Sequence, residues 1–111
     1  MNDKILNFLG LCRRAGKLTV GNDAVTEEIK CGKAELVIIS NDISLNTEKK
    51  LIKVCRASDT QCLKLNRTRD ELSASLGRFC AVVAVMDTGF SKKLVQLINN
   101  ENQEVNVYDK I

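Results

Sequence analysis

Residues 18–42 read LTVGNDAVTEEIKCGKAELVIISND, and this stretch predicts a strand, a turn, a helix and a second strand. Gly21 can take the positive φ that a tight strand-to-helix turn often requires, and Asn22 behind it is a favoured N-cap. Gly32 stands where a glycine would end a helix of about ten residues. Residues 36–39 are apolar without alternation, which is typical of a strand covered on both faces in a mainly parallel sheet.

The predicted turn places a helix N-terminus at the edge of a buried sheet. The first amide N–H groups of a helix have no carbonyl partner within it, and they carry the positive end of the helix dipole. Basic residues stand on either side of this helix in the chain, at Lys17 and Lys33. The turn is therefore a candidate site for an anion such as a phosphate.

The chain around this unit continues the alternation of helices and strands. Apolar residues at helical spacing predict a first helix within residues 2–16 and another over about 46–58, opened by Asn46 or Thr47. Residues 61–65 alternate between polar and apolar side chains, as an edge strand does.

The second half of the chain carries a specific helix-start signal. Thr68 and Glu71 form a capping-box pattern that opens a short helix, and Gly77 is expected to end it. Residues 79–86 are the longest apolar run, which predicts a central strand buried on both faces. Residues 87–98 then predict a last helix with its cap at the start of that range.

The order of these elements predicts one domain over residues 1–98. Helices and strands that alternate in this way indicate an α/β fold, here a three-layer α-β-α sandwich with a mixed sheet of about four strands. From residue 99 the composition becomes polar, and we expect a frayed C-terminal tail over 99–111, in which Val105 and Val107 could form a short strand.

The charge of the chain suits a polyanionic partner without requiring one. There are 17 basic and 14 acidic residues, and the last eleven residues hold three of the acidic and one of the basic ones. Without them the counts are 16 and 11, a net charge of +5. Basic surfaces are the main electrostatic signature of nucleic-acid-binding proteins.

The composition also excludes several classes of function. The chain has no histidine, so histidine-based catalysis is excluded, and we expect no enzymatic activity. Its five cysteines are odd in number and form no CxxC pair, which predicts reduced thiols in the cytoplasm and no metal site. We expect no cofactor. The N-terminal residues are unlike a signal peptide, and no apolar run reaches about eighteen residues, so we expect no membrane partner.

Four strings of sequence resemble the ribosomal kink-turn-binding protein superfamily (L-seven-Ae-like), and more closely its small bacterial YlxQ-type members. The strings are LGLCRRAGKL at 9–18, GKAELVIISND at 32–42, NTEKK at 46–50 and DTGFSKKL at 87–94. In combination they are specific, and the resemblance covers about residues 4–98. It implies a non-enzymatic protein that docks on kink-turns, which are sharply bent RNA duplexes with a short bulge and tandem sheared G·A pairs.

The resemblance also implies where RNA is contacted. In this family the start of the second helix carries the pattern G-x-N-E-x-x-K and enters the widened groove, and the loop before the last strand makes a second contact. Matched forward from Gly21, the chain has Asp23, Ala24 and Glu27 at the last three specified positions. An ionised Asp23 accepts hydrogen bonds but donates none, and Glu27 places an anion near phosphates, so each change weakens the familiar contact.

The sequence leaves two functions open. The first is a structured-RNA-binding protein acting around ribosomes or transcripts, and the second is a protein-interaction module that keeps the fold without strong kink-turn recognition. A nucleotide-binding enzyme is disfavoured because no G-x-G-x-x-G or phosphate-loop motif is present. We expect a monomer. We also expect five cations to lie on one side of the domain, around the start of the second helix: Arg13, Arg14, Lys17, Lys33 and Arg78. The candidate RNA-binding residues are Arg13, Arg14, Lys17, Gly21, Asn22, Asp23, Ala24, Glu27, Lys33, Arg78 and Phe79.

Overall fold

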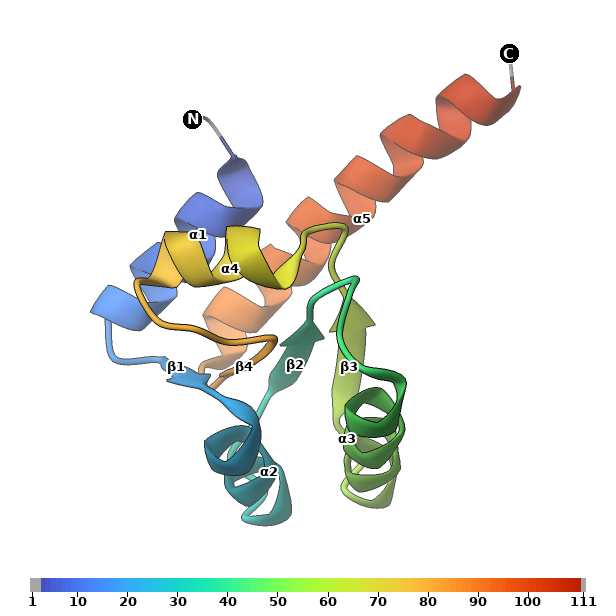
Figure 1. Cartoon of the computed structure of the whole chain (residues 1–111). Coiled ribbons are helices and arrows are strands. Elements are labelled where there is room, and N and C mark those ends of the chain that lie inside the picture. Colours follow the sequence, from blue (N-terminus) through green and yellow to red (C-terminus); the bar gives the residue numbers. More distant parts are fainter. Residues whose placement is uncertain (1–2, 111) are drawn as a thin grey trace.

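The predicted alternation of elements is present in the structure, a computed structural model that describes residues 3–110, with side chains described for residues 3–101. Figure 1 shows helices and strands following one another along this part of the chain. The elements are α1 (Lys4–Arg14), β1 (Leu18–Val20), α2 (Asn22–Lys30), β2 (Leu36–Ile39), α3 (Leu45–Ala57), β3 (Gln61–Lys64), α4 (Arg69–Leu76), β4 (Val82–Val85) and α5 (Thr88–Lys110).

The four strands form one mixed sheet in the order β1-β4-β2-β3. β4 is antiparallel to both of its neighbours, with Val20 opposite Val83 and Val37 opposite Ala84. β2 and β3 are parallel. The mixed sheet is thus confirmed, and so is the edge position of β3. The expectation of a mainly parallel sheet is wrong, because β4 lies between β1 and β2 and runs against both.

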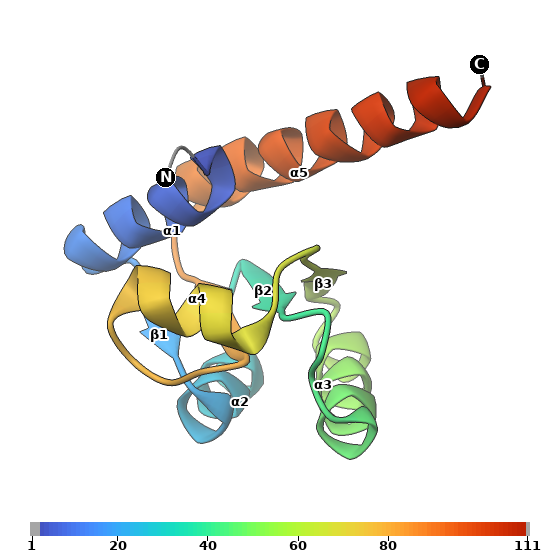
Figure 2. The ribbon, with the colours of Figure 1, turned by 45° about the horizontal axis from the view of Figure 1, so that its top comes forward.

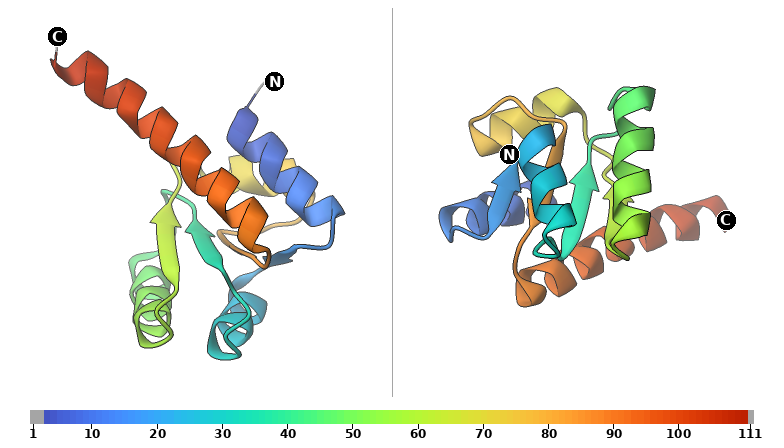
Figure 3. Two further views of the ribbon diagram at one scale, coloured as in Figure 1. Left: turned by 180° about the vertical axis from the view of Figure 1, so that it is seen from behind. Right: turned by 90° about the horizontal axis from the view of Figure 1, so that it is seen from below.

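The three-layer arrangement follows from side chains that alternate across the sheet. On β2, Leu36 and Ile38 point into a core shared with α1, α4 and α5, whereas Val37 and Ile39 point into a core shared with α2 and α3. All four side chains are buried. Figures 1 and 3 show the two sets of helices on opposite faces of the sheet. A strand that is apolar at every position therefore needs a helical layer on each side.

Several helix ends agree with the sequence prediction. Thr68 Oγ1 accepts a hydrogen bond from Glu71 N at 3.1 Å, and Glu71 Oε1 accepts one from Thr68 N at 2.9 Å, which completes the capping box. Gly77 ends α4 with φ of +69°. α3 begins slightly earlier than predicted, at Leu45, because Ser44 caps it by accepting from the amide of Thr47.

The predicted strand over residues 79–86 is wrong in its first three residues. β4 begins only at Val82, and Phe79 is 72% exposed. The cause is that Cys80 forms hydrogen bonds with a side chain instead of with a neighbouring strand. Cys80 N donates to Ser73 Oγ at 2.9 Å, and the Ser73 hydroxyl donates to Cys80 O. The segment before β4 is therefore held by α4 and passes outside the sheet.

The expected frayed tail and the short strand at Val105 and Val107 are also wrong. α5 continues as a helix past residue 98 to Lys110. No glycine or proline follows Gly89, so nothing in the sequence stops the helix. Within the described residues, no helix is long and apolar enough to cross a membrane.

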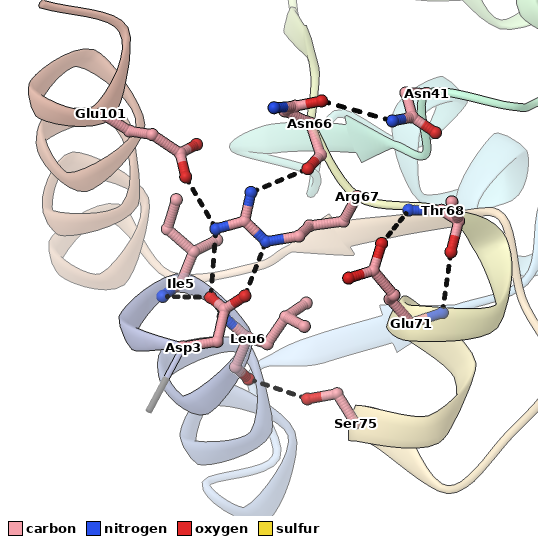
Figure 4. Close-up of polar contacts among 10 residues, drawn as sticks. All are labelled: Asp3, Ile5, Leu6, Asn41, Asn66, Arg67, Thr68, Glu71, Ser75 and Glu101. Atoms are coloured by element: carbon pink, nitrogen blue, oxygen red, sulfur yellow. Dashed lines mark hydrogen bonds and ion pairs between the residues drawn. The ribbon is translucent and has the colours of Figure 1, made fainter. Parts of the chain in front are cut away.

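One arginine links three separate segments on the side of α1, α4 and α5. Arg67 Nε lies 2.6 Å from Asp3 Oδ2, and Arg67 Nη2 lies 2.7 Å from Glu101 Oε1 (Figure 4). Asp3 also caps α1 by accepting from the amides of Ile5 and Leu6. Hydrogen bonds from the Arg67 guanidinium lower the pKa of the Asp3 carboxyl, although partial burial opposes this effect. The Arg67 pair with Glu101 joins α5 to the rest of the domain at this turn.

We predict that Arg67→Met lowers the free energy of unfolding by about 2 kcal/mol, because hydrogen bonds to charged groups contribute roughly that much when partly buried. The Arg67 and Asp3 side chains are only 14% and 17% exposed. Urea unfolding measures the difference. The control is Lys64→Met, which removes the more exposed pair with Glu48 and should cost below about 1 kcal/mol. Equal effects of the two substitutions would contradict the structural role of Arg67.

The same contact predicts a dependence on pH. Because the pKa of Asp3 in the folded state is below its ordinary value of 3.8, the ionised carboxylate stabilises the fold above about pH 4. This stabilisation disappears as the pH falls through the lowered pKa. The difference in unfolding free energy between parent and Arg67→Met should therefore shrink from pH 5 to pH 2, about the range over which such a carboxylate titrates. An unchanged difference at pH 2 would show that the charge of Asp3 contributes nothing to the stability that Arg67 provides.

Candidate functional site

The turn between β1 and α2 is built around a backbone conformation that requires glycine. Gly21 has φ of +104° and ψ of 153°, a region occupied almost only by glycine. Its amide donates to Val82 O at 3.1 Å, and its carbonyl accepts from Val25 N at 3.0 Å. The positive φ is thus confirmed. The prediction that Asn22 is the N-cap is wrong, because Gly21 fills that position and α2 begins at Asn22 itself.

The start of α2 is open to a ligand. Gly21 provides no side chain to cap the helix, so the amides of Asn22, Asp23 and Ala24 have no carbonyl partner within it. All three residues are exposed. Glu27, one turn further along, is also exposed. This end of the helix therefore combines the positive pole of the dipole with two carboxylates, those of Asp23 and Glu27.

Two arginines from other segments reach this turn and its neighbourhood. A Cβ placed on Gly21 would lie 3.5 Å from Arg78 Nη2, and one placed on Gly77 would lie 3.9 Å from Arg13 Nη1. Burial raises the pKa of the Cys80 thiol, and the hydrogen bond with Ser73 and then the positive charges of Arg13 and Arg78 oppose that rise. Arg13 and Arg78 are thus near one another, around the segment between α4 and β4. Figure 2 shows this segment leaving α4 and passing close to α2.

A cavity of about 260 Å³ lies beside the turn. Phe79 contributes an exposed ring to it, and Arg69 Cζ lies 5.6 Å from the centroid of that ring. The Arg69 amide donates to Asp42 Oδ1 at 2.8 Å, which lowers the pKa of that carboxyl. The cavity thus offers an aromatic face, a cation and hydroxyl groups. Its lining residues are Gly21, Asn22, Ile43, Ser44, Thr47, Arg69, Phe79, Cys80, Ala81 and Val82.

A second cavity, of about 340 Å³, lies between α1 and α4. Gly10, Arg13, Arg14, Ser75 and Leu76 line it. Its position next to Gly77 makes it a neighbour of the segment that carries Arg78.

Lys17 and Lys33 do not lie at the start of α2, so the expectation that all five cations surround it is wrong. Lys17 O accepts from Met86 N, and Lys33 follows the far end of α2. Gly21, in contrast, is bonded to Val82 at the other end of β4. Met86 is four residues after Val82 along the extended chain of β4, a distance of about 13 Å. Lys17 is close to the turn in sequence, but β1 carries the chain away from it.

Sequence reasoning missed the contribution of α3 and α4 to the first cavity. Ser44 and Thr47 from the start of α3 line it, and so does Arg69 from the start of α4. Arg69 was detectable in principle, because a cation in the first turn of a helix opposes the helix dipole and adds no stability there. The α3 residues carry no such signal. They are ordinary capping residues that tertiary packing brings to the site.

The chain is similar to known proteins over most of its length. The model of the family described as "Ribosomal protein L7Ae/L30e/S12e/Gadd45 family" matches residues 3–95. RNA-binding protein YlxQ of Enterococcus faecium is 35% identical over 95 residues, covering 86% of this chain and 91% of that protein. The protein of the same name from Bacillus subtilis (strain 168) is 39% identical over 93 residues, covering 83% and 92%. A solved structure of a protein with unknown function from Bacillus halodurans C has a TM-score of 0.82 and 34% identity, covering 88% of this chain and 99% of that one.

We predict that Gly21→Ala lowers the free energy of unfolding by about 3 kcal/mol, because an alanine is strained at this φ and ψ. The matched control is Gly32→Ala at the other end of α2. Gly32 has φ of +73°, in the left-handed helical region, with nothing within 4 Å of the added Cβ, so the cost should be about 1 kcal/mol. Urea unfolding of both variants gives the comparison. If Gly21→Ala is no worse than Gly32→Ala, the turn is less constrained than its backbone angles indicate.

Proposed function

Because the chain belongs to the ribosomal protein L7Ae/L30e/S12e/Gadd45 family, we propose that it is a non-enzymatic, structured-RNA-binding protein that recognises a kink-turn. The observation that carries this proposal is the convergence of two segments distant in sequence. The open start of α2 and the Arg78-Phe79 segment before β4 meet at the 260 Å³ cavity. These are the two places where the sequence resemblance puts RNA contacts.

The chemistry of the two segments suits different parts of an RNA. Free amides at the start of α2 and the Arg78 guanidinium suit phosphate oxygens, which fix the position of a bound protein. The cavity suits an unstacked base, because Phe79 presents a ring 72% exposed and Arg69 adds a planar cation above it. A bent RNA with a bulge offers both phosphates at a widened groove and unstacked bases, whereas a straight duplex offers only the phosphates.

The charges on α2 set the expected strength of this contact. Asp23 and Glu27 stand where the family pattern has an amide and a cation, and neither forms an ion pair within residues 3–101. Two unpaired carboxylates repel phosphates at the same surface that the dipole and Arg78 make attractive. We therefore propose kink-turn binding that is weaker than the family pattern would provide and steeply dependent on salt.

A protein-interaction module is the second candidate. It is favoured by the same exposed carboxylates together with two exposed apolar side chains, Leu45 at 63% and Phe79 at 72%. Under either proposal we place the protein in the cytoplasm as a monomer, and as an RNA-binding protein we place it with ribosomes or transcripts.

The test is a titration of the full chain with a kink-turn RNA and with a straight duplex of equal length, each at two salt concentrations. We expect tighter binding to the kink-turn at both concentrations, because only the bent RNA presents bases to the cavity. Equal affinity for the two RNAs, with an equal decrease as salt rises, would mean that the protein binds phosphate in general and does not recognise the bend. No binding to either RNA would favour the protein-interaction module.

We predict that the triple variant Asp23→Asn, Ala24→Glu, Glu27→Lys binds the kink-turn about tenfold more tightly, since one good base contact discriminates by about 1–3 kcal/mol. Binding to the straight duplex should change far less. The urea unfolding curve should hardly move, because all three positions are exposed and Gly21, not these residues, forms the N-cap. An unimproved kink-turn affinity would mean that the protein uses another surface.

A further inference from the structure

The cavity between α1 and α4, here called the arginine hollow, is lined by Gly10, Arg13, Arg14, Ser75 and Leu76. Its volume is about 340 Å³. Both arginines are exposed, and no acidic side chain lines the hollow. Two guanidinium groups thus line one hollow without a carboxylate, and guanidinium groups match the geometry of phosphate oxygens.

The walls of the arginine hollow are held in place. Ser75 Oγ donates to Leu6 O at 3.1 Å, which ties α4 directly to α1. Leu9 and Leu76 are buried in the core beneath it. Gly10 leaves room for Arg14, whose Nη1 would lie 3.5 Å from a Cβ at that position. The two arginines therefore extend from a rigid base.

Arg67 on the same side of the sheet provides an internal comparison. Its guanidinium forms ion pairs with both Asp3 and Glu101, so its charge is paired within the fold (Figure 4). Within residues 3–101, neither Arg13 nor Arg14 takes part in such an ion pair. Their place in the last turn of α1 suits the helix dipole, but a dipole contact does not require a hollow.

The arginine hollow is continuous with the proposed RNA surface. Arg78 lies beside Gly21 at the start of α2, and Arg13 lies beside Gly77, the residue before Arg78. Arg14 then extends the line of cations into the hollow. Figure 1 shows the end of α1, the end of α4 and the following segment on the same side of the molecule.

We propose that the arginine hollow holds the phosphate backbone of one duplex stem next to the bend of the bound RNA. This inference rests on the proposed function and deepens it: the start of α2 meets the bend, and the hollow meets a stem. Two planar guanidinium groups with no competing carboxylate can donate hydrogen bonds to phosphate oxygens. No aromatic side chain lines the hollow, so it offers nothing on which an unpaired base could stack. The contact is therefore to backbone and independent of base sequence.

The test uses four variants of the full chain: Arg13→Gln, Arg14→Gln, Arg14→Lys and, as a matched control, Arg56→Gln. Arg56 is also an exposed arginine in the last turn of a helix, but it lies at the far end of α3 from Ser44 and Thr47, which line the cavity beside the start of α2. The charge change and the dipole effect are thus the same. Binding of a kink-turn RNA with two long stems is measured at 50 and 200 mM salt, a range used here because phosphate contacts respond steeply across it.

We expect each arginine-hollow variant to flatten the salt slope by about one unit, while Arg56→Gln leaves it unchanged. The ratio of affinities at 50 and 200 mM should fall about threefold for each lost contact. Arg14→Lys keeps the charge and should retain the slope. If the slopes of Arg13→Gln and Arg14→Gln match that of Arg56→Gln, the inference is overturned.

Shortening each stem of the RNA in turn identifies what the hollow contacts. We expect one shortened RNA to bind the parent and Arg14→Gln equally, and the other to keep the difference between them. If both shortened RNAs keep it, the hollow contacts the bend and no stem, and the inference is wrong. Preference for the kink-turn over a straight duplex without any effect of Arg13 or Arg14 would refute the inference and leave the proposed function intact. No preference for the kink-turn over a straight duplex would contradict both the inference and the proposed function.

Discussion

The double-sided burial of β2 and β4 is the constraint on which the rest of this structure depends. Every residue of both strands is buried, so the sheet is stable only if helices cover both of its faces. Fully burying one aliphatic side chain of this size contributes about 1.5–3 kcal/mol, and two strands contribute eight positions, not all of them large. The helices therefore have to divide into two layers, α1, α4 and α5 on one side and α2 and α3 on the other.

This division into layers also creates the candidate interface. β4 runs antiparallel between β1 and β2, so the residue that follows β1 meets the residue that begins β4, and Gly21 N donates a hydrogen bond to Val82 O. The segment that enters β4 must then pass the start of α2. Arg78 and Phe79 lie on that segment, outside the sheet, because Cys80 is bonded to Ser73. An exposed ring and a guanidinium are thus held at an open helix N-terminus by the strand order together with the hydrogen bonds between Cys80 and Ser73.

The arginines of this domain differ in whether a carboxylate from another segment pairs with their charge. Arg67 is bonded to two carboxylates and joins α1, the start of α4 and α5, so its charge is used by the fold. Arg13 and Arg14 line a cavity without a carboxylate, and Arg78 lies beside a glycine. Sequence context does not separate these cases, since all are arginines near helix ends. The partners that distinguish them come from segments more than thirty residues away, such as Glu101 for Arg67.

The sequence by itself determined the elements and their ends where the signal is local. The positive φ at Gly21, the capping box of Thr68 and the two buried strands depend on residues within one turn or one strand, and each was predictable. Only the tertiary structure decided the direction of β4 against its neighbours and the cavity that joins Phe79 and Arg69 to the start of α2. It also decided that Lys17 lies about 13 Å from the turn, at the far end of an extended strand. Strand order and approach between distant segments depend on how two faces of a sheet can be covered at once, and this is a property of the whole chain.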